Sequence, residues 1–170
     1  MYDFSMSVFT WVEGLSFSTF MRESDSLLAY PGFLFLHTLG MSIVAGGTMI
    51  IGFALLGVWP KQTPISPLGR LYPLIYFGFW LEVITGLSMF AKDASTYGRN
   101  PDLYWKLVCI AGGMALLALI RRRVLQVPGV DAGPVSGKAK LMAVGALVCW
   151  FGAIVTGRLI AYLNPFPVFF

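Results

Sequence analysis

The chain alternates between long apolar runs and short polar clusters. Four runs of about 20 or more mostly apolar residues are separated by clusters that contain proline, glycine and charged side chains. A run of that length crosses a hydrocarbon core of about 30 Å as a helix that rises 1.5 Å per residue. The pattern therefore predicts four membrane-spanning helices, over residues 27–59, 71–91, 101–120 and 138–163.

The first 26 residues have a different, one-sided pattern. Apolar residues recur there at helical spacing, with serines and glycine between them: Phe4, Val8, Trp11, Val12 and Leu15. Asp3 is positioned to cap such a helix. A short one-sided helix is typical of a segment that lies in the membrane interface, and packing against a partner subunit is the alternative. Residues 1–26 are predicted to form this amphipathic interfacial segment.

Composition supports a membrane protein. Hydrophobic residues make up 57% of the chain and charged residues only 12%, a balance that differs from that of water-soluble domains. The predicted fold is an all-α integral membrane protein, a four-transmembrane-helix bundle with an N-terminal amphipathic helix. The formal net charge of +4 comes from basic residues at the ends of apolar runs, so we expect no binding to nucleic acid.

The distribution of basic residues predicts the orientation of the chain. The loops after the first and third spans contain one acid, Asp131, and seven basic residues: Lys61, Arg70, Arg121, Arg122, Arg123, Lys138 and Lys140. Basic loops stay on the cytoplasmic side of a membrane. Both termini are therefore predicted to be periplasmic in a bacterial inner membrane, and residues 164–170 to form a periplasmic aromatic tail.

Four ionisable residues lie inside the predicted spans. Counting along the helices places His37 about 15 Å and Glu82 about 14 Å below the outer boundary, with Lys106 and Arg158 roughly 8 Å deep. A buried carboxylate is costly unless it is protonated or paired. We therefore expect Glu82 to be protonated or to pair with His37 or Arg158, either for function or only to hold the spans together. For Lys106 we expect the side chain to reach up to the headgroups.

The helix face that carries this carboxylate otherwise consists of small residues. Gly78, Glu82 and Gly86 are four residues apart, so they share one face of the second span. Small residues allow helices to approach closely in lipid. We expect this face to point into the bundle.

His37 and Met41 are also four apart and lie on one helix face. Nitrogen and thioether ligands suit copper, or an axial position of a b-type haem. His37 is the only histidine, so a haem would need its second ligand from another span or subunit. The candidate cofactor-binding residues are His37, Met41, Glu82 and Arg158, with His37 and Met41 as candidate metal ligands. A quinone or lipid headgroup hydrogen-bonded to His37 or Glu82 is a further alternative.

Short stretches along most of the chain resemble an uncharacterised group of bacterial four-helix inner-membrane proteins, which is loosely similar to the copper-resistance membrane proteins of the D type. The matching stretches are Arg22-Glu23-Ser24, Leu36-His37-Thr38-Leu39-Gly40, Thr85-Gly86-Leu87, Lys106-Leu107 and Gly157-Arg158-Leu159-Ile160-Ala161-Tyr162. The resemblance implies an inner-membrane bundle with His37 and Arg158 at matched positions, and it implies no particular reaction. A further histidine often found late in the third span of that group is absent from Ala115 to Ile120.

The sequence contains no phosphate loop, CxxC, HExxH or serine-nucleophile motif, so no catalytic residue is predicted. We expect a non-catalytic integral-membrane subunit that anchors or completes a larger membrane complex of a redox or energy-transducing kind. Its expected partners are the lipid bilayer and other membrane subunits or a second copy of the chain. A copper or haem electron-transfer protein that uses His37 is the alternative, followed by a quinone-binding or lipid-binding protein.

Overall fold

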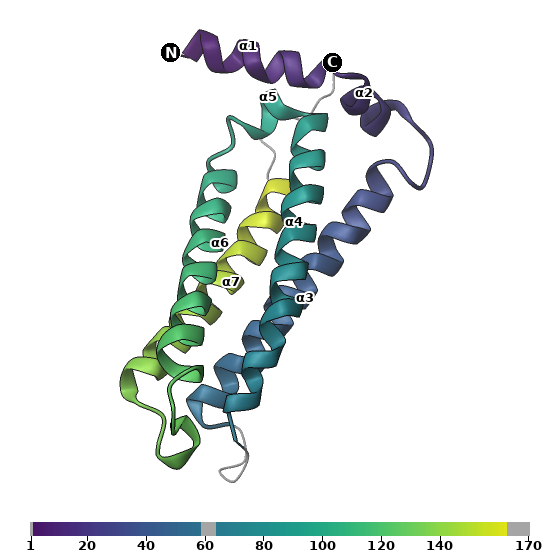
Figure 1. Cartoon of the computed structure of the whole chain (residues 1–170). Coiled ribbons are helices and arrows are strands. Elements are labelled where there is room, and N and C mark those ends of the chain that lie inside the picture. The colour runs from purple at the N-terminus through teal and green to yellow at the C-terminus, as the bar shows by residue number, and fades with distance from the viewer. Residues whose placement is uncertain (1, 59–63, 163–170) are drawn as a thin grey trace.

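The structure is a computed structural model, and it describes residues 2–58 and 64–162. These residues form helices and no strand. Four long helices run side by side as an elongated bundle (Figure 1): α3 (Tyr30–Leu56), α4 (Tyr72–Lys92), α6 (Pro101–Ile120) and α7 (Gly137–Tyr162). Three short helices lie at one end of the bundle: α1 (Tyr2–Glu13), α2 (Ser16–Glu23) and α5 (Ala94–Tyr97). Three short 3₁₀ or π-helical segments lie at the other end: η1 (Ser66–Leu71), η2 (Arg121–Leu125) and η3 (Val130–Ala132).

The described residues contain four helices that are long and apolar enough to cross a membrane, so the predicted number of long apolar helices and the all-α class are confirmed. The boundaries differ at four places. The first helix begins at Tyr30 instead of residue 27, because residues 27–29 form a turn. It ends at Leu56, because Gly57 adopts a left-handed conformation with φ of 89°. The second begins at Ser66, since η1 leads directly into α4. The third continues through a π-helical turn to Leu125. Residues 59–63 and the predicted tail at 164–170 lie outside the described residues.

The four long helices follow one another around the bundle in the order α4, α3, α7, α6. α3 packs along α4, α6 packs along α7, and α3 also contacts α7. Among the described elements, α4 and α6 are not closely packed against each other, and Figure 1 shows α7 behind the space that separates their ribbons. The bundle therefore consists of two helical hairpins, α3–α4 and α6–α7, joined through α3 and α7.

Glycines set the distance between helices within each hairpin. A Cβ atom at Gly40 would lie 2.8 Å from the carbonyl oxygen of Gly78, so α3 and α4 are in backbone contact there. In the second hairpin, a Cβ at Gly113 would lie 2.9 Å from the indole nitrogen of Trp150. Gly78 and Glu82 are buried in this packing, which confirms that their face of α4 points into the bundle.

The predicted N-terminal helix is two helices. α1 ends at Glu13, because the chain turns at Gly14 and Leu15 is extended, and α2 begins at Ser16. The Ser18 hydroxyl donates to the Val12 carbonyl at 2.7 Å and so satisfies one acceptor at the end of α1. The prediction that Asp3 caps this helix is wrong, since α1 already begins at Tyr2.

α1 lies across the end of the bundle and is fixed there by specific contacts (Figure 1). The Phe9 and Phe90 rings meet edge to face at 5.8 Å. The Glu13 carboxylate accepts a 2.6 Å hydrogen bond from the backbone N–H of Ser95, at the start of α5. Trp11 is 67% exposed, so α1 also presents apolar surface that is not packed against the bundle.

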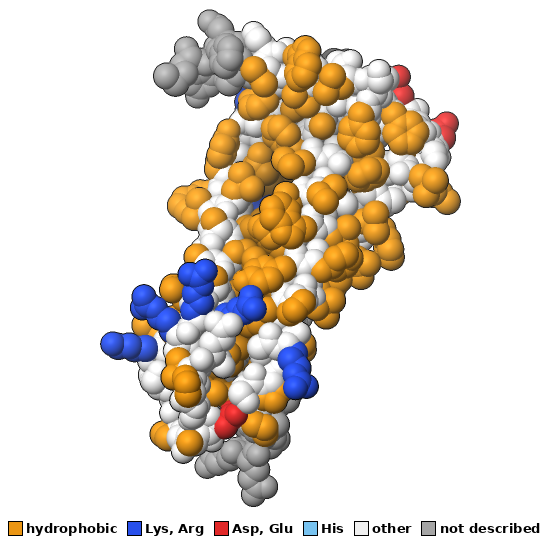
Figure 2. Space-filling model, in the orientation of Figure 1, with side chains coloured by type: hydrophobic (Ala, Val, Ile, Leu, Met, Phe, Trp, Pro, Cys, Tyr) orange, Lys and Arg blue, Asp and Glu red, His pale blue; other side chains and the backbone are white. Residues whose placement is uncertain are grey.

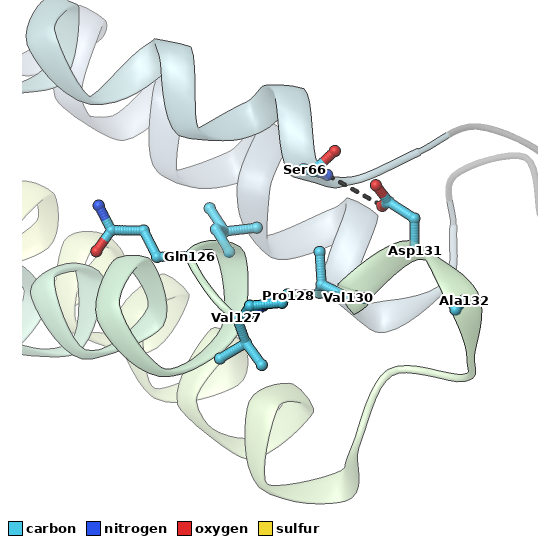
Figure 3. Close-up of a pocket in the computed structure, with 9 residues that line it drawn as sticks. Ser66, Gln126, Val127, Pro128, Val130, Asp131 and Ala132 are labelled. Carbon is cyan, nitrogen blue, oxygen red and sulfur yellow. Dashed lines mark hydrogen bonds between the residues drawn. The ribbon is translucent and has the colours of Figure 1, made fainter.

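At the opposite end of the bundle, Asp131 connects the segment between α6 and α7 to the start of η1. Its Oδ1 accepts a hydrogen bond from the backbone N–H of Ile65 at 2.7 Å. It accepts a second from the backbone N–H of Ser66 at 3.1 Å (Figure 3). This carboxylate therefore satisfies two free donors at the start of η1.

The contacts of Asp131 predict a pH dependence. Hydrogen bonds from the Ser66 side chain, and then from the Ser66 and Ile65 amides, hold the pKa of Asp131 below its ordinary value. The stabilisation is thus complete above the unfolded-state pKa and is lost as the pH falls through the lower folded-state pKa. We expect the Ser66 amide resonance to titrate with a midpoint below 3.8. Asp131→Asn should abolish this titration and Asp102→Asn should leave it unchanged, whereas a midpoint at or above 3.8 would contradict the assignment.

Candidate functional site

The only histidine is held by α4 through one ring nitrogen. His37 Nδ1 lies 3.2 Å from the backbone carbonyl oxygen of Glu82 and 3.1 Å from Thr85 Oγ1. The carbonyl only accepts hydrogen bonds, so Nδ1 carries the hydrogen and donates it. Thr85 donates its own hydroxyl to the Leu81 carbonyl at 2.6 Å. The opposite nitrogen, Nε2, is therefore the acceptor in the neutral ring.

Two charged side chains face His37 Nε2. Lys106 Nζ from α6 lies 3.2 Å away, within hydrogen-bond distance, and Glu82 Oε1 from α4 lies 3.9 Å away. Residues from α3, α4 and α6 thus meet at one nitrogen atom. We refer to these three side chains as the His37–Glu82–Lys106 cluster.

Glu82 is the most deeply buried member of the cluster. Its side chain is 4% exposed, compared with 13% for His37. Neither carboxylate oxygen has a hydrogen-bond partner among the described residues. A buried carboxylate without donors is costly unless it binds a proton or interacts with nearby positive charge. The cluster therefore contains an acceptor whose hydrogen-bonding capacity is unused.

Glycines make room for the cluster. A Cβ at Gly86 would lie 3.1 Å from His37 Cε1, so the absence of a side chain on α4 lets the imidazole lie against that helix. A Cβ at Gly157 would lie 3.6 Å from Lys106 Nζ, so α7 also leaves space beside the lysine. Gly86 and Gly157 thus provide the space that the His37 and Lys106 side chains occupy.

The prediction for Lys106 is wrong. We expected its side chain to reach the headgroups, but it points to His37 Nε2, because that nitrogen offers an acceptor and Gly157 leaves the space. The expected proximity of His37 and Glu82 is confirmed by their 3.9 Å separation. Arg158, the other proposed partner of Glu82, is exposed on α7 and forms no ion pair with a described residue.

The residues around His37 do not form a multidentate metal site. The described part of the chain contains no group of three histidine, cysteine, aspartate or glutamate side chains arranged to hold a metal ion. Met41 is partly buried one helical turn from His37, and no hydrogen bond joins it to the cluster within the described residues. The assignment of His37 and Met41 as metal ligands stays a prediction.

A depression of about 620 Å³ lies at the far end of the bundle. It is lined by Ser66 and by the residues from Leu125 to Ala132 that connect α6 to α7 (Figure 3). The part of α6 from Lys106 to Ile120 separates this depression from Lys106, so the depression does not belong to the cluster. Its lining combines apolar side chains with Gln126 and Asp131, and Asp131 is already bonded to η1.

Sequence reasoning found His37 and Glu82 but missed the roles of Thr85 and Lys106. Thr85 lies three residues after Glu82, on the same side of α4, and this spacing could have indicated it. For Lys106, the sequence offered one indication, Gly157 in α7, because a glycine leaves room for a long side chain from a neighbouring helix.

A search of protein-family models, of curated proteins and of solved structures finds no match to this chain.

Proposed function

We propose that this chain is an integral-membrane protein of a bacterial inner membrane, with periplasmic termini and no catalytic site of its own. It serves as an accessory subunit of a larger redox or energy-transducing membrane assembly. In this proposal α1 and α2 lie in the outer interface of the bilayer, and the basic turns lie in the cytoplasm.

The observation that carries the proposal is the His37–Glu82–Lys106 cluster. Three ionisable side chains from three helices meet between apolar spans, where each would be costly by itself. Such intramembrane groups are typical of proteins that handle ions, protons or cofactors. This supports an energy-transducing assembly over a purely structural membrane anchor.

The distribution of charge supports the orientation. Figure 2 shows basic side chains gathered near the end of the bundle opposite α1, while apolar side chains cover its length. The described residues at this end include Arg70, Arg122 and Lys138. Cytoplasmic ends of membrane proteins carry such an excess of lysine and arginine.

The exposed face of α7 is the surface that we assign to a partner subunit. Large apolar residues on it alternate at spacings of three and four: Leu141, Val144, Val148, Phe151 and Val155. The same spacing continues to Arg158, which is exposed and unpaired among the described residues. A seven-residue repeat of this kind is typical of a seam between two helices, and a carboxylate on the partner helix would satisfy Arg158.

The test is purification of the tagged full-length chain from membranes in a mild detergent. We expect a membrane-protein partner to co-purify, and Arg158→Gln to reduce its recovery several-fold, because the intramembrane charge pair is lost. Arg99→Gln is the matched control, since Arg99 is an exposed arginine outside α7. A monodisperse chain without any protein partner would overturn the accessory role, and a cytoplasmic terminus in reporter fusions would overturn the topology.

A second candidate, a copper or b-type haem protein, is favoured by one observation. His37 Nδ1 donates to a backbone carbonyl, which is the second-shell arrangement of many metal-ligating histidines. In this structure Nε2 faces Lys106 instead of open space. An absorption spectrum and metal analysis of the purified protein test this candidate: a Soret band or stoichiometric copper would support it.

A further inference from the structure

The three members of the cluster lie at increasing depth from one end of the bundle. Lys106 is five residues after Pro101, His37 is seven after Tyr30, and Glu82 is ten before Lys92. These three helix ends lie at the same end of the bundle, the end that carries α1 (Figure 1). At 1.5 Å per residue, the depths are about 8, 10 and 15 Å.

The contacts connect the three residues in the same order. Lys106 Nζ is 3.2 Å from His37 Nε2, and the same nitrogen is 3.9 Å from Glu82 Oε1. The second separation is about 1 Å longer than a hydrogen bond, so a small change of side-chain rotamer would close it. His37 Nε2 thus lies between a donor and a buried acceptor that has no other partner among the described residues.

We propose that the cluster is an intramembrane proton-binding site, with Glu82 as the acceptor and His37 Nε2 as the carrier of protons that enter at Lys106. An N–H bond of the Lys106 ammonium breaks as an Nε2–H bond forms. The Nε2–H bond then breaks as an Oε1–H bond forms on Glu82. A hydronium ion at the outer end then protonates Lys106 again and leaves neutral water, so the cluster gains one proton in total. The inference rests on the membrane placement that we propose above.

The charged groups around the cluster are few. From the three helices that build it, the facing ionisable groups are His37, Glu82 and Lys106 themselves. α7 contributes Gly157 beside the lysine, and Arg158 is exposed. α2 packs on α4, and its Arg22 bonds the Lys92 carbonyl at 3.3 Å, at the outer end of α4. No second described carboxylate therefore competes with Glu82 for the proton within the cluster.

Infrared spectroscopy of the full chain in lipid nanodiscs tests the proposal. A protonated carboxylic acid has a C=O stretch that a carboxylate lacks, so a pH titration reports directly on Glu82. Across roughly pH 5 to 10, a range that includes the ordinary histidine pKa, we expect one buried carboxylic acid band to appear on acidification. The band should be absent from Glu82→Gln, which replaces the carboxyl group by an amide of nearly the same shape.

The rate of protonation tests the route. After release of protons from a caged acid, we expect Lys106→Gln and His37→Gln to slow the appearance of the Glu82 band by about tenfold or more. Lys92→Gln is the control, because Lys92 is at the outer end of α4 and packs over the Tyr30 ring instead of the cluster. Circular dichroism and detergent elution establish that each variant is folded.

Two results would overturn the proposal. If no band depends on Glu82, the cluster does not bind a proton. If the band appears at the same rate in the lysine and histidine variants, protons reach Glu82 by another route. Neither result depends on co-purification of a partner or on reporter fusions, so failure of the proton site and failure of the proposed accessory role are distinguishable.

Discussion

Gly40→Ala is expected to destabilise the protein by forcing α3 and α4 apart. The new Cβ would lie 2.8 Å from the Gly78 carbonyl oxygen and 3.0 Å from the Glu82 amide nitrogen. Both neighbours are backbone atoms, so neither can move aside without separating α3 from α4. Overpacking of this kind costs roughly 1 to 3 kcal/mol, and it would also displace the Glu82 carbonyl that holds His37.

The same helix supplies the matched control for that substitution. A Cβ at Gly46 would meet no atom within 4 Å. Gly46→Ala should therefore be neutral, or stabilising by up to about 1 kcal/mol, because alanine has a higher helix propensity than glycine. Unfolding of both variants in mixed detergent micelles measures the difference. Equal stabilities would show that α3 and α4 are not in backbone contact at Gly40.

Lys106→Met is expected to have the second large effect. It removes the positive charge nearest to His37 and leaves the buried Glu82 carboxylate without a compensating cation. Loss of one member of a buried charged group costs about 3 kcal/mol. We expect a smaller loss for Glu82→Gln, because the amide keeps the shape of the side chain without its charge.

A double-mutant cycle measures the coupling free energy between Lys106 and Glu82. The variant that carries both Lys106→Met and Glu82→Gln should be more stable than the sum of the single losses predicts, by about 1 kcal/mol or more. Lys92→Met is the control, because that lysine lies 4.1 Å from the centre of the Tyr30 ring, away from the cluster. Additive losses in the cycle would mean that Lys106 and Glu82 do not interact.

The hydrophobic pattern alone was enough to predict the four long helices, since a run of about 20 apolar residues has few other stable forms. The ends of these helices were harder to predict. Ser66 starts the second helix and Leu125 ends the third through short 3₁₀ and π turns, and such turns depend on local contacts that periodicity does not encode. The break at Gly14 is likewise accompanied by local contacts, among them the extended backbone of Leu15 and the hydrogen bond from Ser18 to Val12.

The candidate site was predictable only in part. Depth counting from the predicted helix ends placed His37 and Glu82 near each other, and their side chains do meet at 3.9 Å, although counting from the observed helix ends gives different depths of about 10 and 15 Å. It could not give the direction of the Lys106 side chain, which depends on the neighbouring Gly157 and on a free acceptor at His37. The order of the helices around the bundle was also inaccessible from one sequence, and that order decides which residues face each other.

That order has a consequence for biogenesis. Within each hairpin the two long helices are consecutive along the chain and closely packed, so in the membrane placement that we propose each pair can assemble as soon as it is inserted. The bond from Lys106 to His37 joins residues 69 positions apart, and it forms only after the later hairpin has docked on the earlier one. In the membrane placement that we propose, His37 Nε2 and the buried Glu82 carboxylate lack a neighbouring cation until then, so an intermediate that ends before α6 carries both groups uncompensated.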